Sequence, residues 1–288
     1  MRWLIEEYRA AGPSAVEPPP SIDASIDDVV CSLAAAGHAP ILLSLRPRVP
    51  AVASTFGDAL VATEVARNPS WRLEWPHARR LTGRPTGDLA DRLARPRSPG
   101  DPGSDFIYPT MHLTETSGVA EEVLDEPLRS LSVADARRVL LRTAARSMLQ
   151  DDPRAAPYGW THCLTMPQAV LVAADHGADP HVAIAVAATY VLGFRATQGK
   201  VALEPAWVPP PGTAVARAWS ARGSERRDLV VELATFGATH RDAHVAKYTL
   251  ACIDAAEGDP DAAHLYLAAA AHLREWWRAA ERELSATG

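Results

Sequence analysis

The chain has 288 residues, of which 47 % are hydrophobic and 22 % are charged, an ordinary balance for a folded protein with a sizeable core. Its formal net charge of −6 argues against a nucleic-acid-binding protein, which usually carries a basic face. The three cysteines, Cys31, Cys163 and Cys252, lie far apart and outside any CxxC motif, which argues against a disulfide scaffold or a structural zinc finger.

The N-terminal segment and the apolar stretches indicate where the protein is expected to work. Glu6 and Glu7 stand where a signal peptide needs an apolar run. The stretch that comes nearest to a membrane span, residues 182–194, is shorter than the roughly 20 residues that such a helix needs. We therefore expect a cytoplasmic protein with no membrane partner.

Helix signals dominate the chain and predict an all-α fold, with residues 1–288 forming a single helical-bundle domain that ends in an αα-hairpin. Alanine, the best helix former, is abundant. Capping residues, prolines at first helical positions and glycines after last turns mark most helix ends. The predicted helices span residues 25–37, 49–66, 132–149, 165–177, 179–194, 225–236, 239–256 and 260–283, and long irregular loops are predicted at about 67–110 and 198–223.

The second half of the chain also contains predicted helix caps and a pair of adjacent tryptophans. The predicted caps in the second half of the chain are Thr165, Asp179 and Thr239 with Asp242. In the last helix Trp276 and Trp277 are adjacent, so we expect only one of them to pack against the core.

Common catalytic motifs are absent from the sequence. There is no GxGxxG after a strand, no GxxxxGK[ST], no GxSxG and no HExxH, so no nucleotide cofactor is expected and the usual hydrolase and zinc-protease patterns are missing. Ten histidines remain, several of them in apolar, helix-rich surroundings where an unpaired polar ring would be costly. The histidines are therefore the candidates for chemistry.

The most informative stretch contains His240, His244 and Lys247, whose spacing of four and three places them on one face of a helix. The chain then becomes apolar, and burial would favour a neutral lysine amine that could act as a ligand, a base or a nucleophile toward carbon dioxide. A surface histidine pair with a lysine that extends its amine to solvent explains the same pattern equally well.

Three other histidines lie near a predicted helix end or in an irregular stretch. His162 sits just before a helix start between aromatic and apolar residues, as suits a ligand at a helix end, although a core histidine bonded to a backbone carbonyl is commoner. His38 follows a predicted helix end and His112 lies in an irregular stretch, and each alone is a weak signal.

The order of these features resembles the questin oxidase-like family of oxygenases. The resemblance rests on His38-Ala-Pro-Ile-Leu near the N-terminus, on Thr-His162-Cys-Leu-Thr in the middle, and on the more specific Asp242-Ala-His-Val-Ala-Lys247 late in the chain. Such proteins are all-helical and similar to iron-dependent oxygenases that cleave or oxidise polycyclic aromatic ketones. Several histidines and a carboxylated lysine surround their metal.

The resemblance implies a metal site in this chain. It points to His244 and Lys247 as catalytic residues and metal ligands, and to His162 and His38 as further ligands. His112 would be the fourth histidine, with His240 as its competitor. The implied cofactor is ferrous iron, which imidazole and oxygen ligands suit.

Our first hypothesis is therefore an iron-dependent oxygenase that acts with O2 on an aromatic or polyketide-like small molecule. Asp242 or Glu232 could orient a ligand imidazole, and His162 and His244 should lie within reach of each other on facing helices. The aromatic residues expected to line an apolar cavity are Tyr158, Trp160, Phe194 and Tyr248. The alternatives are a metal-free helical binding or scaffold protein, and a zinc-dependent hydrolase, for which no catalytic glutamate stands in a recognisable motif.

Overall fold

The computed structural model describes residues 30, 88–103, 106–124, 131–175 and 177–287, and every regular element in these ranges is a helix. The prediction of an all-α fold is confirmed for this part of the chain. The prediction of a single domain over residues 1–288 stays a prediction. The helices predicted at 25–37 and 49–66 lie outside the described residues, except that Val30 is helical and buried.

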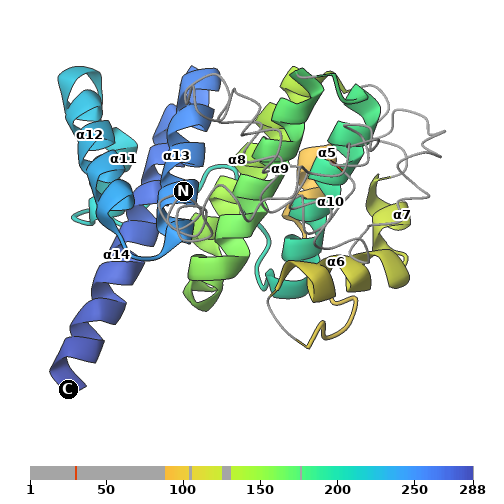
Figure 1. Cartoon of the computed structure of the whole chain (residues 1–288), viewed down its shortest axis with the longest axis horizontal. Coiled ribbons are helices and arrows are strands. Elements are labelled where there is room, and N and C mark those ends of the chain that lie inside the picture. The colour runs from red at the N-terminus through yellow and green to blue at the C-terminus, as the bar shows by residue number, and fades with distance from the viewer. Residues whose placement is uncertain (1–29, 31–87, 104–105, 125–130, 176, 288) are drawn as a thin grey trace, which may run out of the picture.

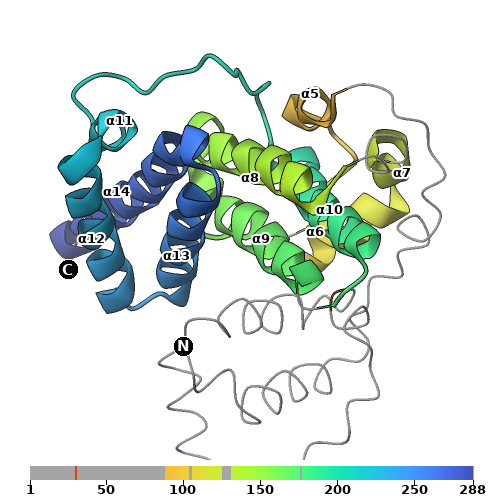
Figure 2. The same cartoon turned by 90° about the horizontal axis from the view of Figure 1, so that it is seen from above.

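The helices form three neighbouring groups (Figures 1 and 2). Three long helices occupy the middle: α8 (Val133–Gln150), α9 (Thr161–Asp175) and α10 (Pro180–Gln198). On one side of them lie α5 (Leu89–Ala94), α6 (Ile107–Thr116) and α7 (Val119–Leu124). On the other side lie α11 (Ala214–Ser220), α12 (Gly223–Thr239), α13 (Ala243–Gly258) and α14 (Ala263–Thr287). Helix α13 packs against α9, which joins the last group to the middle one.

Two of the central helices begin where their capping residues predict. The Ser132 hydroxyl accepts a hydrogen bond from the backbone N–H of Asp135 at the start of α8. Asp179 caps α10 in the same manner, with Pro180 at the first helical position. Helix α10 is buried on nearly every side, as its almost continuous apolar sequence predicts, and it runs four residues past the predicted end at Phe194 to Gln198.

Helix α9 begins earlier than predicted. A 3-10 turn (Pro153–Ala155) and a π-helix (Ala156–Trp160) lead directly into it, so the chain is already helical when it reaches Thr161. The predicted cap at Thr165 is wrong, because that hydroxyl donates to the carbonyl of Thr161 from inside the helix. The helical path starts instead at Asp152, which caps the 3-10 turn.

The boundary between α12 and α13 also differs from the prediction. Helix α12 continues past Gly237 to Thr239, whose hydroxyl donates back to the carbonyl of Thr235. Asp242 alone caps α13, so the predicted cap at Thr239 is wrong. A 3-10 turn (Pro260–Ala262) then connects α13 to α14, and these two helices are in contact.

Parts of both predicted irregular loops are helical, which corrects that expectation. Helix α5 and the first turn of α6 lie within 67–110, and α11 lies within 198–223. Side-chain caps start two of these short helices, Asp88 for α5 and Thr213 for α11. The prolines of the second segment precede Thr213 and so do not interrupt α11.

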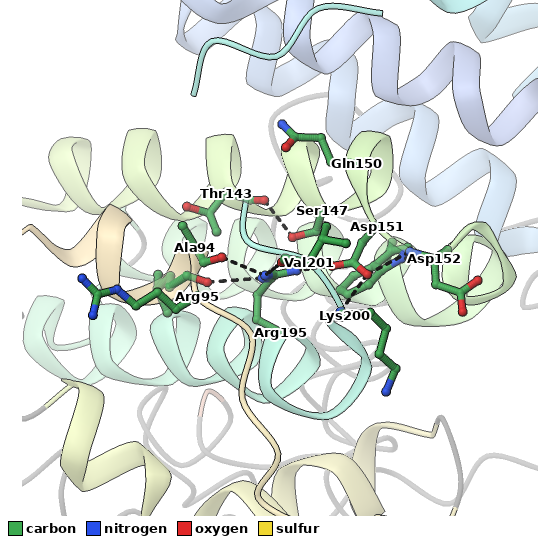
Figure 3. Close-up of polar contacts among 12 residues, drawn as sticks. Ala94, Arg95, Thr143, Ser147, Gln150, Asp151, Asp152, Arg195, Lys200 and Val201 are labelled. Atoms are coloured by element: carbon green, nitrogen blue, oxygen red, sulfur yellow. Dashed lines mark hydrogen bonds and ion pairs between the residues drawn. The ribbon is translucent and has the colours of Figure 1, made fainter. Parts of the chain in front are cut away.

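A buried ion pair joins α10 to α8 and α5 (Figure 3). The side chains of Arg195 and Asp151 are fully buried, with Nη1 of Arg195 2.5 Å from Oδ2 of Asp151. Every other polar group of the pair is bonded to the backbone, which offsets the cost of burying two charges. Arg195 also donates to the carbonyls of Leu93, Ala94 and Val201, and Asp151 accepts from the N–H groups of Asp152 and Lys200.

Across the described ranges, none of the helices is both long and apolar enough to cross a membrane.

Candidate functional site

His162 and His244 lie against each other although they are far apart in the sequence. Their ring centroids are 4.9 Å apart and the rings meet edge to face, at an interplanar angle of 85°. His162 comes from the first turn of α9 and His244 from the first turn of α13, and these helices pack together. The expectation that the two imidazoles lie within reach of each other is confirmed.

Asp242 holds His244 in two ways. Its Oδ1 accepts from the backbone N–H of His244 and lies 2.8 Å from ring nitrogen Nδ1. Burial alone would raise the pKa of Asp242, but the hydrogen bonds from His244 outweigh it and lower that pKa. An ionised carboxylate at this distance keeps a proton on Nδ1, so Nε2 carries the lone pair that a metal or a proton would take.

Aromatic rings border the two imidazoles. Tyr158, in the π-helix, meets the ring of His244 edge to face at 5.0 Å, and its hydroxyl lies 3.4 Å from Oδ2 of Asp242. Phe194 stacks on His162 with 6.1 Å between ring centroids. Tyr158 is 44 % exposed, so the site lies close to the molecular surface. Its hydroxyl contact with Asp242 gave no signal in the sequence, where Tyr158 stood out only as a possible cavity-lining residue.

The other two aromatic residues expected near the site make different contacts. Trp160 is fully buried, packs near Arg195 and donates through its indole N–H to the carbonyl of Asp152. Tyr248 is fully buried beside the thiol of Cys252, and burial raises the pKa of its hydroxyl.

Lys247 lies one turn after His244 on the same face of α13. Burial lowers the pKa of its amine, and the negative charge of Asp242 opposes this shift only in part. Within the described residues its amine forms no ion pair. The direction of this pKa shift agrees with the sequence-based expectation of a lysine that loses its proton more easily than usual.

His240 does not share that helix face, which corrects the sequence prediction. It is the residue that ends α12, and α13 begins only at Ala243. Its Nδ1 accepts from the backbone N–H of Asp242 at 3.0 Å, and its ring contacts Phe236 and Trp277. The ring of His240 therefore makes its contacts away from the His162–His244 pair.

Two further candidates are not brought to the pair. His112 is exposed on α6 and stacks on Tyr108 at 5.6 Å, and α6 packs on α10 and α7 in the group far from α13 (Figure 1). Glu232 pairs with Arg274 and Arg217, so Asp242 is the carboxylate that orients an imidazole. His38 lies outside the described residues.

The donor geometry can be tested against a shared metal ion. With a metal–nitrogen distance of about 2.1 Å, two imidazoles on one ion hold their ring centres roughly 5 Å apart. The His162–His244 separation of 4.9 Å fits this arrangement, and the Asp242 contact supplies the carboxylate that commonly orients a metal-bound histidine. Among the described residues no group of three or more histidine, cysteine or carboxylate side chains could hold a metal, so the pair is an incomplete set by itself.

The neighbouring thiol does not add a ligand. Cys163 is fully buried, and burial raises its pKa to about 12, which keeps it a neutral thiol. The candidate donors in the described part of the chain are therefore two imidazoles and one amine.

Comparisons of the chain with family models, with curated proteins and with solved structures gave no match.

Proposed function

We propose that this protein is an iron-dependent oxygenase that acts on an aromatic or polyketide-like small molecule. The observation that carries the proposal is the pair of imidazoles 4.9 Å apart, one of them oriented by a carboxylate. The resemblance of the Asp242–Lys247 stretch to the questin oxidase-like signature supports the same chemistry. Bound ferrous iron would supply the electrons that activate dioxygen.

The protein's own residues have separate tasks in this proposal. His162 and His244 would hold the ion through ring nitrogens, and Asp242 keeps the proton of His244 on Nδ1. Phe194 and Tyr158 pack against the imidazoles and limit the access of water. His38 is proposed as a further ligand from its place in the resemblance. His112 is left out of the ligand set because it is exposed on α6.

Lys247 is proposed as the source of an oxygen ligand. Its lowered pKa raises the fraction of neutral amine at neutral pH. The amine nitrogen attacks the carbon of CO2, a nitrogen–carbon bond forms as one carbon–oxygen π bond breaks, and the π electrons move to that oxygen. The nitrogen then loses one proton to solvent, and the resulting carbamate carries a negative charge on oxygen. Lys247→Arg should abolish metal-dependent activity, because guanidinium stays charged and cannot be carboxylated. Lys247→Glu should keep a trace of activity, because it restores an anionic oxygen.

We propose that the protein works in the cytoplasm, and two of its cysteines support this. Cys163 and Cys252 are both buried free thiols, which suits the reducing cytoplasm.

Elemental analysis of the purified full-length chain tests the proposal. We expect about one iron per chain, its loss in His244→Ala and His162→Ala, and its retention in His112→Ala, which is the matched control on α6. Absence of metal from the purified protein, together with no binding of added ferrous ion by calorimetry, would overturn the proposal and leave the metal-free binding or scaffold protein.

A further inference from the structure

The turn between α12 and α13 contains a histidine that is almost inaccessible to solvent. The side chain of His240 is 4 % exposed. Its ring lies 5.2 Å from that of Phe236 on α12 and 4.9 Å from that of Trp277 on α14. The ring therefore packs against both α12 and α14.

The two ring nitrogens of His240 have different partners. Nδ1 accepts the backbone N–H of Asp242 at 3.0 Å, so the ring proton belongs on Nε2. Nε2 lies 3.4 Å from the carboxylate of Glu281 on α14, which is an electrostatic contact rather than a well-aligned hydrogen bond. These partners specify one tautomer and one orientation for the ring.

The bond to the backbone of Asp242 acts on the residue that orients His244. Asp242 must hold an extended backbone conformation to cap α13 while its carboxylate reaches Nδ1 of His244. His240 fixes that backbone from one side, and the α14 residues Trp277 and Glu281 hold His240 from the other.

We propose that His240 is a positioning residue that transmits the placement of the C-terminal helix α14, through Asp242, to the imidazole of His244. This inference rests on the proposed function insofar as His244 is to bind a metal. The claim about the orientation of His244 stands apart from any metal.

Two substitutions separate the acceptor role of His240 from its packing role. His240→Asn keeps an acceptor, Oδ1, where Nδ1 stood, but loses the ring. His240→Phe keeps a ring between Phe236 and Trp277 but has no acceptor for the N–H of Asp242. The matched control is His264→Phe on α14, whose ring meets that of Trp219 edge to face at 4.4 Å and lies in the first turn of α14, far from Trp277 and Glu281 along that helix.

The first readout is the ring-nitrogen chemical shifts of His244, measured by NMR on the full-length, chelator-treated chain. We expect a single Nδ1-protonated form in the wild type, in His240→Asn and in the His264→Phe control, and a mixture of tautomers in His240→Phe. The second readout is binding of ferrous ion by calorimetry. We expect it to weaken about tenfold in His240→Phe, as when outer partners of a metal ligand are lost.

The outcomes distinguish the two proposals. Unchanged His244 shifts in His240→Phe, or equal disturbance by His240→Asn and His240→Phe, would overturn the positioning role even if ferrous ion binds. A tautomer change confined to His240→Phe in a chain that binds no ferrous ion would support the positioning role and overturn the proposed function. If His240→Phe does not fold, His240→Leu, which also has no acceptor for the N–H of Asp242, takes its place with the same expected shifts.

Discussion

A single oxygen of Asp242, Oδ1, lies 2.8 Å from both the backbone nitrogen and the ring Nδ1 of His244. The carboxylate therefore starts helix α13 and fixes the tautomer of the histidine in its first turn. One side chain thus has a structural and a chemical role, and substitutions can separate the two.

Asp242→Asn should leave the fold intact and weaken metal binding. Asparagine caps helices about as well as aspartate, so the free energy of unfolding should change by less than about 0.5 kcal/mol. Loss of the negative charge beside Nδ1 should weaken ferrous-ion binding by about 10- to 100-fold. Asp179→Asn is the matched control, because Asp179 caps α10 through the N–H of the exposed His181 with the same Asp-x-His spacing. Equal binding by wild type and Asp242→Asn in calorimetry would remove Asp242 from the site.

Lys247→Met should change the pH dependence of stability. Because burial lowers the pKa of Lys247, the folded chain binds this proton less tightly than the unfolded chain, where a lysine pKa is about 10.4. The charged lysine therefore destabilises the fold fully below its folded pKa, and this penalty disappears as the pH rises toward the unfolded value. The stability of Lys247→Met relative to wild type should thus be greatest at neutral pH and fall on raising the pH.

Urea unfolding at neutral and alkaline pH measures this difference. Lys200→Met, at an exposed position, is the control for the loss of one lysine side chain at the surface. A Lys247→Met difference that rises with pH would have the wrong sign for a buried amine.

Arg195→Met should destabilise the protein strongly. The substitution leaves the buried Asp151 carboxylate without its cation and removes donors from three carbonyls, and breaking such a pair costs about 3–5 kcal/mol. Arg154→Met is the comparison, because Arg154 pairs with Asp152 while its own side chain is 88 % exposed, and a pair of that kind contributes less than about 1 kcal/mol. Chemical denaturation of both variants measures the two losses in the free energy of unfolding. Similar losses would contradict the conclusion that the buried Arg195 pair matters more for stability than the exposed Arg154 pair.

Gly159→Ala should destabilise the π-helix that precedes His162. A Cβ atom at this position would lie 1.7 Å from Oε1 of Gln198, which must then move. Overpacking of this kind costs about 1–3 kcal/mol. Among the described residues the buried amide of Gln198 has no hydrogen-bond partner, so Gln198→Ala should be mild and should restore stability in the double variant. A double variant that is no more stable than Gly159→Ala would show that the strain lies in the backbone.

The sequence predicted helices best where a side chain caps the backbone. Ser132 and Asp179 mark α8 and α10 correctly, because a capping oxygen acts within three residues and needs no tertiary contact. The start of α9 was missed because a π-helix without a side-chain cap continues into it. The Trp pair was also mispredicted: Trp276 and Trp277 both pack partly against the core, with their rings in contact at 5.1 Å.

The candidate site was predictable only in part. Helix-end histidines on facing helices correctly suggested that His162 and His244 meet. His240 was placed on the wrong face because the spacing rule assumes an unbroken helix, whereas Asp242 starts a new one. Whether a histidine such as His112 points toward solvent depends on the packing of α6 on α10, which local sequence does not specify.

The Arg195 ion pair has a consequence for synthesis of the chain. Arg195 donates to the carbonyls of Leu93 and Ala94, which precede it by 102 and 101 positions. A helix of six residues such as α5 is too short to persist by itself in water. At translation rates of about 5–20 residues per second, the ribosome needs roughly 5–20 s to travel from α5 to Arg195. During that interval the 89–94 segment lacks its final partners. We therefore expect this segment to be the first part of the α5–α7 group that proteases and chaperones can reach on the nascent chain.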